Sequence, residues 1–290
     1  ASIPVGKTPV DVAVGFGSVW VANQDDGTIS RISASSRTVD RTIGITGTPL
    51  ALAVGSGYVW ATTQQGGLFR IDPASADVAQ IPVRVSNIRQ GFFGGTTNTL
   101  TGIAAGAGSI WLLWADGGRA LRLDPTTGAV VRRIPDETSP SGIAFGNGAL
   151  WLSELASVSR VDPLTDTLTG TAQVGALQGL GSTTVAAGGG SVWVAKSESG
   201  DVWQVSPNGP TAVGRIAVGP NVGHIAVGQG GVWVARPKAG QVVRIDPRTG
   251  RLRTIAVGTG AYAVATGAGL VWVTTVGGTP HDVSIEGGGG

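Results

Sequence analysis

A short phrase, Gly-x-Gly-x-apolar-Trp, returns seven times along the 290-residue chain and constrains its fold more than any other feature. The tryptophans that end the seven phrases are Trp20, Trp60, Trp111, Trp151, Trp193, Trp233 and Trp272. Their successive spacings are 40, 51, 40, 42, 40 and 39 residues. A period near 40 residues, built from short strands, is typical of β-propellers, in which each repeat forms one blade. The sequence therefore predicts an all-β, seven-bladed β-propeller.

Each repeat contains four short segments that are bounded by turn residues and are predicted to be strands. In the first repeat these segments are residues 11–14, 18–22, 28–32 and 38–43. Asp-Pro pairs follow the third segment in several later repeats, where Asp accepts backbone hydrogen bonds and Pro fixes φ for a turn. An Arg two residues before this turn is interpreted as a structural partner of the turn or of the neighbouring blade. Each blade is thus expected to be a four-stranded antiparallel sheet.

The last repeat lacks a fourth strand of its own, because its third strand is followed only by a run of glycines. The N-terminal residues Ile3 to Gly6 match fourth-strand endings such as Ile255 to Gly258. We therefore expect the N-terminal strand to complete the last blade and close the ring, which removes an exposed sheet edge. Residues 1–286 are predicted to form a single propeller, and residues 287–290 a glycine linker or tail that leads to another domain or an anchor.

The composition narrows the possible chemistry. Cys and Met are both absent, so the chain has no disulfide, thiolate metal site or thiol nucleophile. Twenty basic against 18 acidic residues give little support for nucleic-acid binding, and no apolar run reaches the roughly 18 residues of a membrane-inserted helix. The absence of oxidisable sulfur side chains favours an extracellular or cell-surface location.

Two stretches of the repeats resemble a known family. Residues 9–23 (PVDVAVGFGSVWVAN) and residues 244–250 (RIDPRTG) are similar to the repeats of bacterial YVTN-type and virginiamycin B lyase-like propellers. The likeness spans all seven repeats, and it implies the propeller architecture. Such repeats occur in lyases, surface proteins and sensor domains of receptor kinases, so the resemblance leaves the function open.

The chain departs from the lyase members of this family at their functional positions. Those lyases act on a cyclic streptogramin antibiotic with Mg²⁺, and their two catalytic His positions hold Gly223 and Tyr262 here. His224 lies one residue along the strand, a step that turns a side chain to the other face. The positions of the family's Glu and Tyr hold Val276 and Val10. The resemblance therefore implies a shared scaffold without lyase chemistry.

Two positions vary from repeat to repeat and are expected to surround the channel on one face of the ring. The position nine residues before each Trp holds Asp11, Ala51, Gly102, Gly142, Thr184, His224 and Ala263. The position three residues after each Trp holds Asn23, Thr63, Trp114, Glu154, Lys196, Arg236 and Thr275. The candidate ligand-binding rim drawn from these positions and their neighbours is Asp11, Asn23, Trp114, Glu154, Lys196, His224, Arg236 and Lys238.

This rim is basic over the fifth and sixth repeats, where Lys196, Arg236 and Lys238 gather near His224 in the predicted ring. An anionic ligand or an acidic loop is expected to pair there, although variable rim residues that are simply solvated give the same pattern. Trp114 offers a flat face for a sugar or an Arg; the alternative is that it covers a neighbouring blade.

The 51-residue spacing before the third phrase indicates an insertion over residues 85–101. It contains Arg89, Phe92 and Phe93 among glycines and threonines. Adjacent aromatic residues in such a loop are expected to close the channel mouth or to contact a partner. Packing of one Phe against the second or third blade is the alternative.

Candidates for catalysis are few, since the chain has two His, four Glu and no Cys. Convergence of His224, Glu154 and Asp11 would build a hydrolase or lyase site. Asp25 and Asp26 are candidates for Ca²⁺, or simply for a hairpin turn. We therefore expect a non-catalytic sensor, adhesion or scaffold propeller without a cofactor, which recognises a protein or an anionic or glycan ligand. The alternatives are a lyase-like enzyme dependent on Mg²⁺ and a self-assembling surface protein.

Overall fold

The computed structural model describes residues 2–83, 100–114, 119–134, 140–175 and 182–276, together with the backbone of residues 282–287. Arg89, Phe92 and Phe93, which were expected to contact a partner, lie outside the described residues. The last three glycines of the expected tail and His281 also lie outside them.

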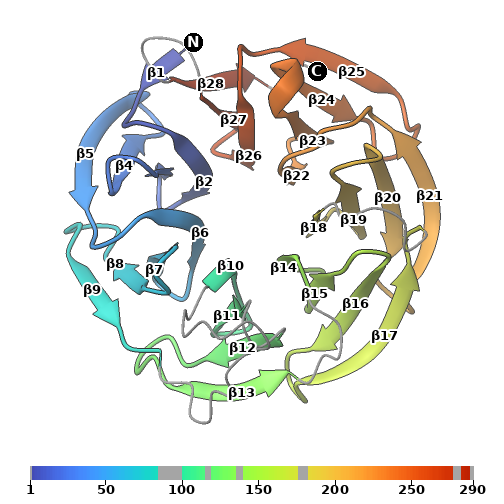
Figure 1. Ribbon diagram of the computed structural model, residues 1–290, viewed down its shortest axis with the longest axis horizontal. Helices are drawn as coiled ribbons and strands as arrows, with labels where there is room; N and C mark the ends of the chain where they lie inside the picture. The colour runs from blue at the N-terminus through green and yellow to red at the C-terminus, as the bar shows by residue number, and fades with distance from the viewer. Residues whose placement is uncertain are drawn as a thin grey trace.

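Six four-stranded antiparallel sheets, each made of consecutive strands, surround a central axis (Figure 1). The first three blades are β2 (Pro9–Gly15), β3 (Ser18–Asn23), β4 (Thr28–Ser33) and β5 (Thr38–Gly44); β6 (Pro49–Gly55), β7 (Tyr58–Thr63), β8 (Leu68–Ile71) and β9 (Val78–Ile81); and β10 (Leu100–Gly106), β11 (Ser109–Trp114), β12 (Arg119–Leu123) and β13 (Val130–Ile134).

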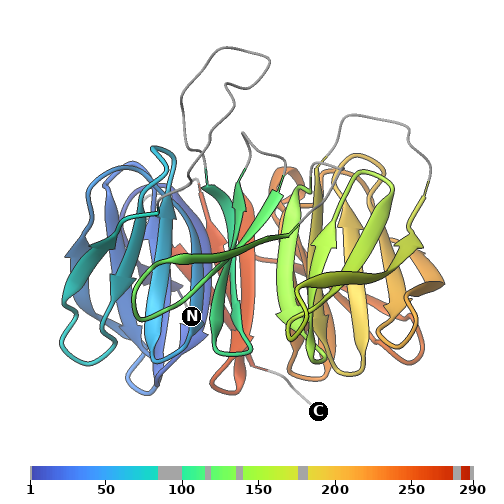
Figure 2. The ribbon, with the colours of Figure 1, turned by 90° about the horizontal axis from the view of Figure 1, so that it is seen from below.

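The next three blades continue the same order around the axis, and a short 3₁₀ helix, η2 (Pro237–Ala239), connects two strands of the sixth. Their strands are β14 (Gly142–Gly146), β15 (Ala149–Ser153), β16 (Ser157–Asp162) and β17 (Thr167–Gln173); β18 (Thr183–Gly188), β19 (Ser191–Lys196), β20 (Asp201–Ser206) and β21 (Thr211–Ala217); and β22 (Ile225–Gly228), β23 (Gly231–Arg236), β24 (Gln241–Ile245) and β25 (Leu252–Ala256). Figure 2 shows the blades side by side, and Figure 1 shows that the first strand of each blade lies nearest the axis.

A seventh sheet, described in part, lies between the sixth and first blades. It contains β26 (Ala261–Gly267), β27 (Leu270–Thr275) and β28 (Asp282–Gly287), and the N-terminal β1 (Ser2–Pro4) pairs with β28. The buried Ile3 belongs to an apolar cluster with Val12 of β2 and Trp272 of β27. The N-terminal strand thus packs against both the seventh sheet and the first blade.

The Gly-x-Gly-x-apolar-Trp phrase has a separate physical reason for each of its fixed residues. In the first blade, Phe16 and Gly17 both have positive φ (54° and 72°), as a tight hairpin between β2 and β3 requires. A Cβ on Gly15 would stand 2.3 Å from the side chain of Val54 on the next blade. The indole N–H of Trp20 donates to the carbonyl of Gly15. One phrase therefore sets a turn, the distance between blades and the position of a core Trp.

The predicted role of the third-strand arginines is confirmed for three of them. Arg31, Arg70 and Arg122 each donate from Nη1 to the carbonyl of the turn proline in the next blade, over 2.9, 3.2 and 3.0 Å. Arg160 and Arg244 instead bond within their own blades.

Apolar strands fill the spaces between blades, as in the second strands β3 and β11, whose side chains are buried on both faces. Among the described residues, no helix is both long and apolar enough to cross a membrane.

Candidate functional site

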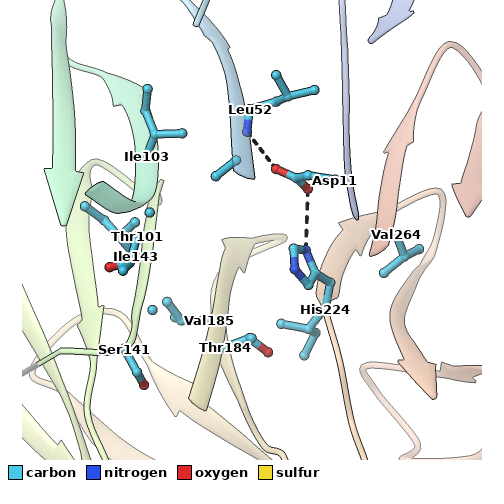
Figure 3. Close-up of a pocket in the computed structure, with 14 residues that line it drawn as sticks. Asp11, Leu52, Thr101, Ile103, Ser141, Ile143, Thr184, Val185, His224 and Val264 are labelled. Atoms are coloured by element: carbon cyan, nitrogen blue, oxygen red, sulfur yellow. Dashed lines mark hydrogen bonds and ion pairs between the residues drawn. The ribbon is translucent and has the colours of Figure 1, made fainter. Parts of the chain in front are cut away.

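The first strands of the blades deliver one position each to the mouth of the central channel. A cavity of about 260 Å³ opens there, and its lining includes six of the seven residues that lie nine places before the repeated Trp. These six are Asp11, Ala51, Gly102, Gly142, Thr184 and His224. We call this space the channel cavity; Figure 3 shows side chains from several blades pointing into it.

Asp11 is the acidic group of the channel cavity, and it is buried. Its Oδ1 accepts a hydrogen bond from the backbone N–H of Val12 (2.8 Å), and its Oδ2 accepts one from Leu52 of the second blade (2.7 Å). Burial raises the pKa of Asp11, while the nearby His224 and the two backbone N–H groups oppose that rise. Asp11 therefore joins the first two blades and faces the channel at once.

His224 approaches Asp11 from the sixth blade. Its Nδ1 lies 3.5 Å from Oδ1 of Asp11 (Figure 3). The imidazole is 37% exposed, and its centre lies 5.7 Å from that of the Tyr262 ring, at an angle of 46°. Two of the three residues whose convergence would build a catalytic site are thus together, in a geometry that forms an ion pair when the imidazole is protonated.

Hydroxyl groups around the channel cavity are mostly bound to other parts of the protein. Ser141 Oγ lies 2.8 Å from Thr183 Oγ1 and 3.2 Å from the Thr183 carbonyl. Thr184 Oγ1 donates to the carbonyl of Gly223 on the next blade, over 3.1 Å. These contacts, like those of Asp11, connect neighbouring blades.

A second cavity, of about 300 Å³, lies beside the channel cavity over the fifth to seventh blades. It shares Thr184 and His224 with the channel cavity. Its polar and aromatic lining includes Ser182, Ser197, Asn221, His224, Lys238 and Tyr262. We call it the side pocket. Loops between strands build most of it, since Asn221 lies between β21 and β22 and Lys238 lies in η2.

Three residues predicted for the rim are instead inside the blades. Asn23 is 0% exposed and donates from Nδ2 to the hydroxyls of Thr28 and Ser30. Trp114 is 6% exposed and packs in an apolar cluster with Leu100, so the expectation of a free flat face is wrong, and it serves as core instead.

Glu154 is the third of these residues. It is 7% exposed, accepts hydrogen bonds from Ser157 and Ser159 of its own blade, and is absent from both cavities. Glu154 therefore does not converge with Asp11 and His224, so the three-residue arrangement that would have favoured a hydrolase or lyase site is not formed. All three side chains are buried where a second strand ends, and Asn23 and Glu154 are bonded to the third strand of their own blade, so variation at this position does not by itself indicate exposure.

The basic residues predicted for the rim differ in whether they line a cavity or interact with other parts of the protein. Lys238 is exposed and lines the side pocket. Lys196 and Arg236 are half-buried; Lys196 already has an interaction partner, and Arg236 donates from Nη1 to Gln241 Oε1 over 3.3 Å. His224 and Lys238 are thus the predicted basic residues that the side pocket brings together.

The sequence predicted His224 and Lys238 of the side pocket but not Ser182, Ser197 and Asn221, and it gave Tyr262 no binding role. A signal for such residues exists at the position ten places before each repeated Trp, one place before the position that lines the channel cavity. This position holds Thr101 and Ser141, which line the channel cavity, and Tyr262, which lines the side pocket. Ser197 and Asn221 have no such signal, because they lie in connections whose sequences differ from blade to blade.

The described residues contain no group of three His, Asp or Glu side chains placed to hold a metal ion. The Asp25 and Asp26 carboxylates, considered for Ca²⁺, bind the segment after β1: Asp25 accepts from Thr8 Oγ1, and Asp26 accepts from the backbone N–H of Lys7 over 2.7 Å. They therefore attach this segment to the turn between β3 and β4.

Comparison with known proteins identifies a fold and no family. No protein-family model matches the chain, and no curated protein matches its sequence. Solved structures with the same architecture include Kuenenia stuttgartiensis hydrazine synthase (TM-score 0.77, 12% identity, 97% of this chain and 96% of that one) and the Cps50 (Swd1) β-propeller domain of Myceliophteria thermophila (0.78, 11%, 99% and 98%). BamB from Moraxella catarrhalis is also similar (0.63, 13%, 96% and 83%). At these identities the likeness shows a β-propeller fold alone.

Proposed function

We propose that this chain is a non-catalytic binding propeller that takes its ligand on the channel-mouth face, over the fifth to seventh blades. The observation that carries this proposal is the side pocket, which adjoins the channel cavity and shares His224 with it. Concave sites with an aromatic side chain and a few polar groups are typical of ligand recognition. The exposed Tyr262 and Lys238 give the side pocket those properties.

The same proposal covers the setting in which the binding occurs. The lack of Cys and Met favours a secreted or surface-held sensor, adhesion or scaffold module. We also propose that the seventh sheet is a complete blade closed by β1, giving a seven-bladed ring of the YVTN-like kind. The pairing of Ile3 with Val283 supports this closure.

A lyase-like enzyme is the second candidate, and the pairing of His224 with Asp11 favours it, because a carboxylate can orient an imidazole that acts as a base. The residues do not fit the Mg²⁺ of such lyases, however. Both oxygens of Asp11 accept backbone N–H groups, and Gly223 and Tyr262 stand at the positions where the resemblance implies catalytic His. Product formation from a cyclic depsipeptide lactone, lost in His224→Ala, would favour the enzyme over the binding module.

A thermal-shift panel tests the proposed function. Anionic and neutral oligosaccharides, acidic peptides and divalent cations are added to the wild type, to Tyr262→Ala and to the control Phe16→Ala. Phe16 is an exposed aromatic residue in the β2–β3 turn. A ligand that binds the native state raises Tm, and we expect the rise to vanish in Tyr262→Ala and to persist in Phe16→Ala. A rise that survives Tyr262→Ala, or no rise with any compound, would contradict the proposed site.

A further inference from the structure

We infer that the side pocket binds an acidic sugar residue, with the sugar ring against Tyr262 and its carboxylate near Lys238. The inference rests on the proposed function and narrows its ligand from a broad class to a carboxylated saccharide. Four features of the pocket carry it: polar side chains without partners, an exposed aromatic ring, one unopposed cation and a small volume.

Among the described residues, polar side chains of the side pocket lack the hydrogen-bond partners that those of the channel cavity have. Within the described part of the chain, the side chains of Ser182, Ser197 and Asn221 have no hydrogen-bond partner, whereas Ser141 and Thr184 are bound to neighbouring segments. A hydroxyl or amide with no protein partner can donate to and accept from a ligand without breaking a native bond. Side chains of this kind match the several hydroxyl groups of a sugar.

Tyr262 supplies the apolar surface that a sugar ring needs. It is 43% exposed, although it is a large aromatic residue at the start of an inner strand. The tilted His224 ring stands beside it and forms a second wall. A pyranose has one face of C–H groups and a rim of hydroxyls, so it can cover the Tyr262 ring while the rim reaches the polar side chains.

The charge of the pocket selects an acidic sugar. Lys238 is exposed and has no ion-pair partner within the described residues. His224 lies 3.5 Å from Asp11, so the pocket's other basic side chain already has a carboxylate beside it. None of the described residues that line the pocket is acidic; Glu198 follows Ser197 and is exposed. A carboxylate on the ligand is the natural partner for Lys238.

The size of the pocket limits how much of a saccharide it can hold. About 300 Å³ lies at the lower end of the range for small-molecule sites. One acidic residue is therefore expected to enter, while the rest of a longer glycan lies over the channel-mouth face.

Isothermal titration with defined saccharides tests this inference. The probes are trigalacturonate, neutral galactotriose and citrate as an anion that is not a sugar. We expect trigalacturonate to bind with Kd on the order of 0.1 to 1 mM, at least about threefold more tightly than galactotriose. Lys238→Ala should remove that preference, since an exposed ion pair contributes a factor of about two to five. Tyr262→Ala should weaken both saccharides about tenfold. Lys7→Ala and Phe16→Ala are the matched controls and should bind as the wild type does.

Each other result overturns the inference in a distinguishable way. Equal affinity for the acidic and neutral saccharides, or citrate binding as tightly as trigalacturonate, would exclude an acidic-sugar site. An acidic peptide that binds in a Tyr262-dependent manner while no saccharide does would exclude the sugar and leave the proposed function standing. If no saccharide or peptide responds to Tyr262→Ala, the inference and the proposed function fail together.

Discussion

The two faces of the ring use the same strands for different purposes. On the hairpin face, formed by the Gly-x-Gly turns and the Asp-Pro turns, the same contacts return from blade to blade. Trp60 and Trp151, for instance, both donate to the first Gly of their phrase. On the channel-mouth face, equivalent positions hold residues of different chemistry, such as Asp11, Gly142 and His224. Repetition therefore indicates structural roles, whereas divergence indicates a place for binding only where the residue also lines a cavity.

Removal of residues 1–6 is expected to have the largest effect, because β1 pairs with β28 of the seventh sheet and its Ile3 is buried in an apolar cluster. Loss of this side chain and of the β1–β28 pairing should cost about 3–5 kcal/mol of unfolding free energy. That corresponds to a fall in Tm of roughly 10 °C, measured by calorimetry. Ser2→Ala, at an exposed position of the same strand, is the control. An unchanged Tm in the truncated chain would exclude ring closure by the N-terminus.

Two glycines of one hairpin test whether the first Gly of the repeated phrase sets the distance between blades. A Cβ on Gly146 would stand 2.3 Å from the backbone carbonyl oxygen of Ala187 in the next blade, whereas one on Gly148 meets nothing within 4 Å. Gly146→Ala should therefore destabilise by about 3 kcal/mol, and Gly148→Ala by only about 1 kcal/mol, from its positive φ. Urea unfolding measures both values. Equal losses would show that the first Gly does not set the distance between blades.

The carboxylates of the two faces have pKa shifts of opposite sign, so the stability of the protein should depend on pH in opposite ways through each group. Backbone hydrogen bonds lower the pKa values of the turn carboxylates Asp72, Asp124 and Asp246, so their stabilisation is present above the ordinary carboxyl pKa and is lost as the pH falls through the lowered values. Burial raises the pKa of Asp11, so its contribution is present at low pH and is lost as the pH rises through the raised value.

The measurement is Tm between pH 2 and 7 for the wild type, Asp11→Asn and the triple Asn variant of the three turns. Because the imidazole of His224 lies 3.5 Å from the Asp11 carboxylate, Asp11→Asn is also compared in a His224→Gln background. Relative to the wild type, Asp11→Asn should gain stability as the pH rises from about 4 to 7, and the triple variant should lose less on acidification. A constant difference between Asp11→Asn and the wild type would refute the shift assigned to burial.

The smallest effect on stability is expected at the side pocket. Tyr262 and Lys238 are exposed, and surface substitutions usually change the unfolding free energy by less than about 0.5 kcal/mol. Tyr262→Ala and Lys238→Ala should therefore keep the Tm of the wild type to within about 2 °C. A large fall in the Tm of either variant would show that the residue stabilises the fold, and it would contradict the view that the two faces have different roles.

The architecture could be predicted from the sequence because its rules repeat. Seven copies of one phrase predict the hairpin, the core Trp and the blade period, and the link from Arg31 to the next blade follows from the same pattern. Exposure at the rim could not be predicted, because Asn23 and Glu154 vary between repeats and yet lie between packed sheets. The side pocket depends on Asn221 and Lys238, which lie in connections whose sequences differ from blade to blade. The sequence thus locates the channel-mouth face but not the pocket on it.

Hydrogen–deuterium exchange with a ligand identified in the thermal-shift panel compares the two faces in one measurement. We expect bound ligand to slow exchange in residues 196–201, 218–224 and 237–240, which adjoin the side pocket, and to leave the Gly-x-Gly and Asp-Pro turns unchanged. Slower exchange confined to those turns would contradict the account, since it would place the binding function on the face that the repeats build alike.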